Sequence, residues 1–366
     1  MSARLREWVG LAAVAAGLGL TGCAPSAPPA NDAPASAPAA AAPKAEPTGP
    51  TVKLTGSGAS FPAPLYQKWF KDYNAKHPEV QVDYQSIGSG GGVKAVIAKT
   101  VDFGASDAAM KDDEIKQVDV GVQLLPMTAG SIVLAYNLEG VTGLKLSRDA
   151  YVGIFSGKIK KWNDPAIAKT NEGAKLPDTP INVVVRSDGS GTSYVFTKHL
   201  STVSSEFSGK IGTNKLPNWP EGFTKSKGNE GVTASLKSTP GAIGYVEYGY
   251  AKGQSLTFAS LQNKAGKFVE ATPESGAASL AAVKLPDNLI GWASDPEGDA
   301  CYPIVTFTWV MVYKKYTDAA KWKTLKEVLD YALTDGQKDA DALGYIPLPA
   351  EVVTKAKAAL DTVTAS

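Results

Sequence analysis

The chain has 366 residues, with 37 Lys and Arg against 36 Asp and Glu, so its formal net charge is +1. This balance argues against a nucleic-acid-binding surface, which needs an excess of basic side chains. The 43% of hydrophobic residues is typical of a globular protein, and the length is enough for two ordinary domains.

Residues 1–22 have the features of a signal peptide. Arg4 and Arg6 precede an apolar run, residues 9–20, that is too short to span a bilayer as a helix. The run ends in Leu20-Thr21-Gly22-Cys23, which resembles the lipobox of bacterial lipoproteins. The resemblance implies cleavage before Cys23 and a lipid on its sulfur. The alternative is an ordinary signal peptide with an incidental cysteine. We therefore expect an exported protein, lipid-anchored to the cell membrane and facing the periplasm or the cell exterior.

The segment that follows Cys23 has an unusual composition. Of residues 24–50, 11 are Ala and 8 are Pro, and none is aromatic or a large aliphatic residue. Such a segment cannot bury enough apolar surface to offset its conformational entropy. Residues 23–50 are thus predicted to form a disordered tether to a folded body at 51–366.

The body alternates between strand-like and helix-like segments, which predicts an α/β architecture. Strands are expected at 52–54, 80–85, 132–136, 181–185 and 304–313. Apolar stripes predict helices near residues 65, 93, 194 and 321. A strand is followed by a Ser/Gly-rich turn and a helix start at three places, near residues 55–62, 87–92 and 186–192. The first amides of a helix lack intrahelical partners and carry partial positive charge, so this repeated arrangement indicates an anion-binding site.

Motifs of common enzyme classes are absent from the sequence. It contains neither Gly-x4-Gly-Lys-Ser/Thr nor Gly-x-Ser-x-Gly. Its two histidines, His77 and His199, are far apart and are interpreted as structural or solvent-facing. We predict no catalytic residue, no metal and no cofactor.

Two other features have less specific interpretations. Cys301 is the one cysteine of the body and is predicted to be a small buried apolar side chain. Lys158, Lys160 and Lys161, followed by Trp162, form a local basic patch that is either a solvated surface or a face for a partner.

Taken together, the loops resemble those of the phosphate-binding proteins that serve phosphate-specific ABC importers. The matching segments are Thr55–Pro64, Ile87–Gly92, Val101–Asp107, Arg186–Ser193, Pro240–Tyr245 and Leu343–Pro349. Two departures are mild: Ser60 stands where Thr is common, and Gly90 stands where a second serine is often found.

The resemblance implies a two-lobed type II periplasmic binding protein fold, with the ligand between lobes that hinge closed around it. Lobe 1 would comprise 51–130 and 303–366, and lobe 2 would comprise 131–302. The chain would cross near 128–131 and return near 301–305. The implied phosphate-binding residues are Ser60, Phe61, Ser89, Asp107, Arg186, Ser190, Gly191 and Thr192. Asp188 would orient Arg186. The implied partners are inorganic phosphate and the permease and ATPase subunits of an importer, and we expect a monomer that binds no nucleic acid.

Asp107 is the residue that would select the anion. Phosphate near neutral pH keeps a proton, which an ionised carboxylate can accept as a hydrogen bond, whereas sulfate has none to offer. A site built around such a bond can reject the analogue that lacks it by roughly 10⁴-fold. The open alternatives are a receptor for another tetrahedral oxyanion, an extracytoplasmic phosphoesterase, and a surface adhesion or phosphate-sensing role.

Overall fold

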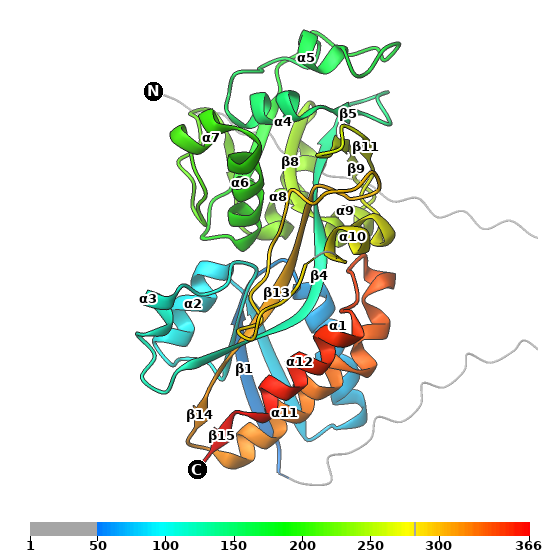
Figure 1. Cartoon of the computed structure of the whole chain (residues 1–366). Helices are drawn as coiled ribbons and strands as arrows, with labels where there is room; N and C mark the ends of the chain where they lie inside the picture. The colour runs from blue at the N-terminus through cyan, green and yellow to red at the C-terminus, as the bar shows by residue number, and fades with distance from the viewer. Residues whose placement is uncertain (1–49, 282) are drawn as a thin grey trace, which may run out of the picture. The chain divides into compact units, whose positions relative to one another are not determined.

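The computed structural model describes residues 50–281 and 283–366. Its central element is a mixed β-sheet (Figure 1). Its strand order is β2-β1-β3-β13-β4-β8-β6-β7, with β12 paired to β13 and β9 paired to β4. These strands are β1 (Val52–Gly58), β2 (Val80–Ser86), β3 (Phe103–Ser106), β4 (Val122–Asn137), β6 (Asn182–Arg186), β7 (Thr224–Ser226), β8 (Ala242–Glu247), β9 (Thr257–Phe258), β12 (Ala293–Ser294) and β13 (Ile304–Tyr313). Two small sheets contain β5 (Lys145–Leu146), β10 (Ser260–Gln262) and β11 (Phe268–Val269), and β14 (Lys315–Tyr316) and β15 (Thr364–Ala365).

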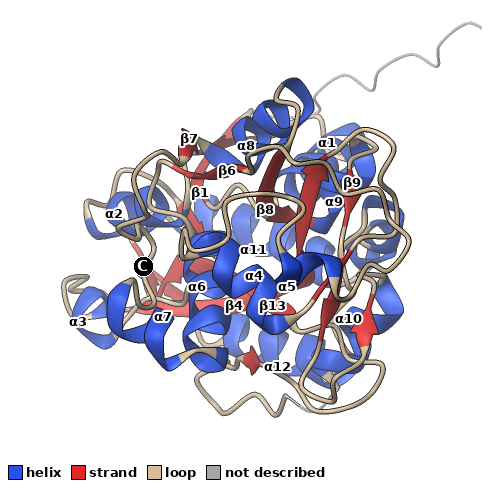
Figure 2. Ribbon diagram, turned by 90° about the horizontal axis from the view of Figure 1, so that it is seen from above, coloured by secondary structure: helices blue, strands red, loops and turns tan. Residues whose placement is uncertain are grey.

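Helices lie on both sides of the strands (Figure 1), and the view from above shows them around the strands (Figure 2). The helices are α1 (Ala63–Lys76), α2 (Ser89–Ile97), α3 (Asp112–Ile115), α4 (Arg148–Phe155), α5 (Pro165–Ala168), α6 (Gly191–Val203), α7 (Ser205–Lys210), α8 (Gly228–Ser238), α9 (Tyr248–Gly253), α10 (Pro273–Leu280), α11 (Ala319–Leu333) and α12 (Ala350–Asp361). Two 3₁₀ helices span Asp335–Asp339 and Asp341–Leu343.

The elements predicted from periodicity are confirmed. The expected strands at 80–85, 181–185 and 304–313 are β2, β6 and β13, and the expected helices are α1, α2, α6 and α11. The first strand is longer than predicted, because β1 pairs with β2 along its whole length and with β3 at its end. The ring of Phe103 covers Gly56, so a side chain at Gly56 would collide with it.

Two long strands, β4 and β13, connect the two halves of the sheet. β13 is antiparallel to β4 from the pair Tyr313 and Val122 to the pair Val305 and Ser131. From Ile132 onward β4 pairs with β8 instead. This exchange of partner falls where the chain is predicted to cross between the lobes, and the names lobe 1 and lobe 2 are kept below for the predicted residue ranges.

The histidines and Cys301 occupy the structural positions expected of them. His77 is the C-cap of α1, and His199 is buried with its Nε2 2.9 Å from the hydroxyl of Tyr151. Burial lowers the pKa of His199 to about 3, so its ring is neutral at physiological pH. Cys301 is also buried.

The basic patch is less basic than its sequence suggests. Lys158 forms an ion pair with Glu206 and Lys161 forms one with Asp178, while Trp162 is fully buried. The predicted signal peptide, Cys23 and all but the last residue of the predicted tether lie outside the described residues.

Candidate anion-binding site

Three helix starts carry the predicted site, and each follows a strand of the sheet. Loops after β1 and β2 lead to Ser60 and Ser89, and the loop after β6 leads to the N-cap Ser190, whose Oγ accepts a hydrogen bond from the N–H of Ser193 (3.0 Å). Ser89 and Gly191 are the first residues of α2 and α6, so their amides have no intrahelical acceptor. The arrangement therefore supplies backbone donors of the kind that binds anions.

The two sides of the site are in direct contact. The N–H of Gly90 in lobe 1 donates to the carbonyl of Gly189 in lobe 2 over 2.7 Å. A Cβ on Gly191 would lie 2.4 Å from the Oγ of Ser89 and 2.6 Å from Oδ2 of Asp107. A side chain at Gly191 would thus block this close approach, which explains why glycine stands there.

Arg186, at the end of β6, supplies the site with a buried positive charge. Its Nε and Nη2 donate to the two carboxylate oxygens of Asp188 over 2.8 and 2.5 Å. Its Nη1 makes a single, long contact within the described residues, 3.4 Å to the hydroxyl of Thr192. Asp188 thus fixes one edge of the planar guanidinium and leaves the Nη1 edge for a further acceptor.

Asp107, just after β3, brings a buried carboxylate to the predicted site. Its Oδ1 accepts a hydrogen bond from Thr308 in β13 over 2.8 Å, and its Oδ2 has a weak one from Ser89 over 3.4 Å. Burial raises the pKa of Asp107 to about 7, although these hydroxyls and the charge of Arg186 act to lower it. Its protonation can therefore change near neutral pH.

The structure brings all nine predicted residues into one connected group. Phe61, directly after Ser60, is fully buried, and its carbonyl accepts a hydrogen bond from the Tyr345 hydroxyl over 2.7 Å. The remaining members are linked by the contacts above, or through Asn229, which donates to both Ser60 and Thr192.

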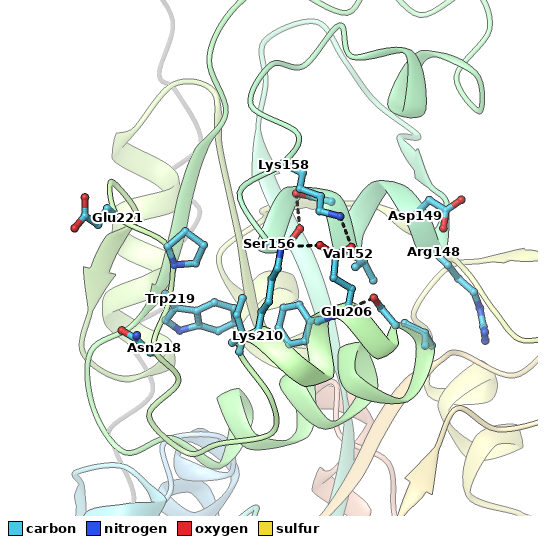
Figure 3. Close-up of a pocket in the computed structure, with 16 residues that line it drawn as sticks. Arg148, Asp149, Val152, Ser156, Lys158, Glu206, Lys210, Asn218, Trp219 and Glu221 are labelled. Carbon is cyan, nitrogen blue, oxygen red and sulfur yellow. Dashed lines mark hydrogen bonds and ion pairs between the residues drawn. The ribbon is translucent and has the colours of Figure 1, made fainter.

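A separate surface cavity of about 700 Å³ lies in lobe 2, between α4, α7 and the loop that contains Trp219 (Figure 3). Part of its charged rim is paired, because Glu206 binds both Lys158 and Lys210. None of the nine predicted site residues lines it. The cavity is therefore distinct from the anion site.

Comparisons with known proteins show the family to which the chain belongs. A family model described as a PBP superfamily domain matches residues 38–335. The phosphate-binding protein PstS of Pasteurella multocida is 46% identical over 312 residues, which cover 83% of this chain and 89% of that protein. PstS of Methanocaldococcus jannaschii is 40% identical over 82% of this chain and 84% of its own length. The chain belongs to the PstS family of phosphate-binding proteins.

Solved structures show the same fold as this PstS-family chain. One is a high affinity periplasmic phosphate-binding protein bound with phosphate, with a TM-score of 0.70, 20% identity, and coverage of 84% of this chain and 93% of that one. Another, a putative phosphate ABC transporter substrate-binding protein from Clostridium perfringens, has a TM-score of 0.61 and 19% identity over 81% of this chain and all of that one. The predicted α/β type II periplasmic binding protein fold is confirmed.

The structure accounts for one departure from the PstS pattern. A Cβ on Gly90 would lie 3.1 Å from the Cα of Gly189, so a serine here would press on the opposite backbone. Glycine instead lets the two loops meet directly through the Gly90 N–H.

Two residues that contact the predicted site were missed by the sequence-based predictions. Asn229 follows the short strand β7 at the start of α8, a fourth strand-to-helix turn with only a Gly-Asn pair to mark it. Thr308 lies in the middle of the apolar strand β13, where an alternating threonine was the one visible signal. Both residues are fully buried.

Proposed function

We propose that this chain is an extracytoplasmic receptor that captures inorganic phosphate between lobe 1 and lobe 2 and delivers it to an ABC importer. The supporting observation is the buried set of donors that surrounds one acceptor. Arg186, the hydroxyls of Ser60, Ser190 and Thr192, and the first amides of α2 and α6 are donors, and Asp107 is the acceptor. Family membership and the phosphate-binding names of the relatives agree with this function.

The anion is held by hydrogen bonds and not by net positive charge. Asp188 balances the charge of Arg186, and Asp107 adds a further carboxylate. A ligand with several acceptor oxygens and one proton matches this set, because the proton can meet Asp107 while the oxygens meet the donors. Phosphate near neutral pH has this pattern, and fully ionised sulfate does not.

The same arrangement makes hydrolysis the weaker alternative. A phosphoesterase would need a nucleophile or a metal-bound water aimed at phosphorus, and the hydroxyls of Ser60 and Thr192 are each hydrogen-bonded by Asn229. We propose that the chain binds and releases phosphate without chemical change. A receptor for another tetrahedral oxyanion remains the second candidate, and the measurements below distinguish it.

The remaining assignments extend this proposal. We infer that lobe 1 and lobe 2 hinge about β4 and β13, because these strands carry the chain between them. The permease and ATPase subunits of an importer are the proposed partners of the monomeric receptor. A lipid on Cys23 is the proposed anchor, and mass spectrometry of the protein from membranes would detect it.

Calorimetric titration of the purified protein with phosphate, arsenate, sulfate and a phosphate monoester tests the function. We expect tight binding of phosphate and arsenate, binding of sulfate weaker by roughly 10⁴-fold, and no turnover of the monoester. Micromolar or tighter sulfate binding would contradict the role of Asp107, and release of phosphate from the monoester would contradict the receptor function.

A further inference from the structure

We propose that Asn229 is a positioning residue that aims the hydroxyl hydrogens of Ser60 and Thr192 at the bound anion, and that it aims the hydroxyl of Ser60 only when the two lobes are closed. The inference rests on the proposed function, since the anion is phosphate. Asn229 is fully buried and is the second residue of α8.

The orientation of the Asn229 amide is fixed by a group that can only donate. The backbone N–H of Glu247, at the end of β8, lies 3.0 Å from the amide oxygen of Asn229. Because an N–H cannot accept, the oxygen must face Glu247 and the NH₂ group must face the other way. That NH₂ group lies 3.0 Å from the Oγ of Ser60 and 3.1 Å from the Oγ1 of Thr192, with one hydrogen available for each.

This contact uses the acceptor capacity of both hydroxyls. The Oγ of Ser60 also accepts from the backbone N–H of Asn229 over 3.0 Å, so both of its lone pairs are occupied. The Oγ1 of Thr192 accepts from Asn229 and, over 3.4 Å, from Arg186. Neither hydroxyl donates a hydrogen bond to an acceptor within the described residues. Each O–H hydrogen must therefore point away from Asn229, and we infer that it points to the anion.

The consequence is that two hydroxyls of the site can only donate to the anion. A freely rotating hydroxyl can accept the proton of a P–OH group as well as donate to a phosphate oxygen. With the hydroxyls of Ser60 and Thr192 restricted to donation, Asp107 is left to receive that proton. Asn229 therefore contributes to selectivity without touching the anion.

The orientation of the Ser60 hydroxyl also depends on closure of the two lobes. Ser60 belongs to lobe 1 and Asn229 to lobe 2, 169 positions apart in the chain. Lobe opening would separate them and release the hydroxyl of Ser60. Closure thus turns Ser60 into an obligate donor at the moment the anion is enclosed.

A double-mutant cycle on the full-length protein tests this inference, with phosphate affinity as the readout. Asn229→Ala should weaken phosphate binding by about 10- to 100-fold, since hydrogen bonds to a charged ligand lose their alignment. In the Ser60→Ala/Thr192→Val background, the same substitution should cost less than about 3-fold, because no hydroxyl remains to be oriented. If Asn229→Ala weakens phosphate binding by the same factor in both backgrounds, the proposal is overturned.

Thr233→Val is the matched control, because Thr233 is a buried residue of the same helix whose hydroxyl donates to the carbonyl of Asn229 over 2.8 Å. It should leave phosphate affinity within about 2-fold of the wild-type value.

Asn229→Asp is a second variant for the case in which Asn229→Ala does not fold. The aspartate keeps the side-chain volume but offers an acceptor to both hydroxyls, which would turn them away from the anion. It should bind phosphate at least 100-fold more weakly, on the order expected when charge-assisted hydrogen bonds are lost. Wild-type affinity in this variant would overturn the proposal. Failure of the wild-type protein to bind phosphate would instead refute the proposed function.

Discussion

The two halves of the site each hold a carboxylate, fully buried at Asp107 and half-buried at Asp188, and the two carboxylates have opposite surroundings. Asp107 in lobe 1 accepts hydrogen bonds from the hydroxyls of Thr308 and Ser89, and burial raises its pKa to about 7. Burial would also raise the pKa of Asp188 in lobe 2. There the hydrogen bonds and charge of Arg186, with the N–H of Gly228, outweigh burial and lower the pKa below its usual value.

This difference separates two roles that one residue type can play. Asp188 stays ionised and holds Arg186 in place, so its charge does not respond to the ligand. Asp107 has no cation hydrogen-bonded to it among the described residues, so its protonation can follow the proton that the ligand brings. Selectivity for a protonated anion needs a carboxylate like Asp107, whose charge can change. Holding a guanidinium in a fixed orientation needs a carboxylate like Asp188, which stays ionised.

Removal of Arg186 would leave both carboxylates without a hydrogen-bonded cation, and it should have the largest effect on phosphate affinity. Arg186→Ala deletes the cation and leaves the half-buried Asp188 without its partner, so we expect phosphate affinity to fall by about 10²- to 10³-fold. Calorimetric titration measures this loss. Arg148→Ala is the control, because Arg148 forms an ion pair with Asp295 elsewhere in lobe 2 and should change phosphate affinity by less than about 2-fold. Equal losses in the two variants would contradict the role of Arg186.

Substitution of Asp107 should act on selectivity. Asp107→Asn replaces the acceptor with an amide that can donate to a fully ionised oxygen, so the phosphate-to-sulfate affinity ratio should fall by roughly 10²-fold or more. Competition titrations at pH 8 measure the ratio. Asp188→Asn is the control, and it should weaken the binding of phosphate and of sulfate without lowering the phosphate-to-sulfate affinity ratio. An unchanged ratio in Asp107→Asn would place discrimination elsewhere.

The raised pKa of Asp107 also predicts a pH-dependent stability of the phosphate-free protein. The folded state binds the Asp107 proton more tightly than the unfolded state, so the stabilisation is complete below about pH 4 and is lost as the pH rises to about 7. Asp107→Asn should therefore be more stable than the wild type at pH 8, by about 1 to 3 kcal/mol, with little difference at pH 4. Urea denaturation in phosphate-free buffer measures this difference. A stability difference between Asp107→Asn and the wild type that does not vary with pH would contradict the raised pKa of Asp107.

The contrast between the carboxylates also marks where sequence reasoning succeeded. The turns that contain Ser89, Ser190 and Arg186 were predicted as anion-binding because a strand, a Ser/Gly turn and a helix start are local in the chain, while the family resemblance assigned the individual residues. The family resemblance supplied Asp107 and the two-lobed fold.

The residues that escaped prediction act through contacts distant in sequence. Thr308 reaches Asp107 across 201 positions, and Asn229 reaches Ser60 across 169. No local pattern can show that a threonine in an apolar strand faces a carboxylate. The pKa of Asp107 could not be predicted either, because it follows from burial that only the assembled sheet provides.

The smallest predicted effect concerns an ion pair between the two halves. The Nζ of Lys215 lies 3.3 and 3.4 Å from the carboxylate oxygens of Glu114 in α3. Lys215 also accepts a hydrogen bond at its carbonyl from the N–H of Ser190 over 2.8 Å, so it stands beside the anion loop. The pair therefore joins the lobes at the rim of the site.

Lys215→Ala should raise the phosphate dissociation rate by only about 2- to 5-fold, because partly exposed ion pairs contribute about 0.2 to 1 kcal/mol. The effect should shrink when salt rises from about 50 to about 500 mM, since the charges become screened. Stopped-flow dissociation measures both. Lys210→Ala breaks a more exposed pair with Glu206 within lobe 2 and should leave the rate unchanged. A rate increase that is equally large at high salt would mean that Lys215 holds the lobes together by packing and not by charge.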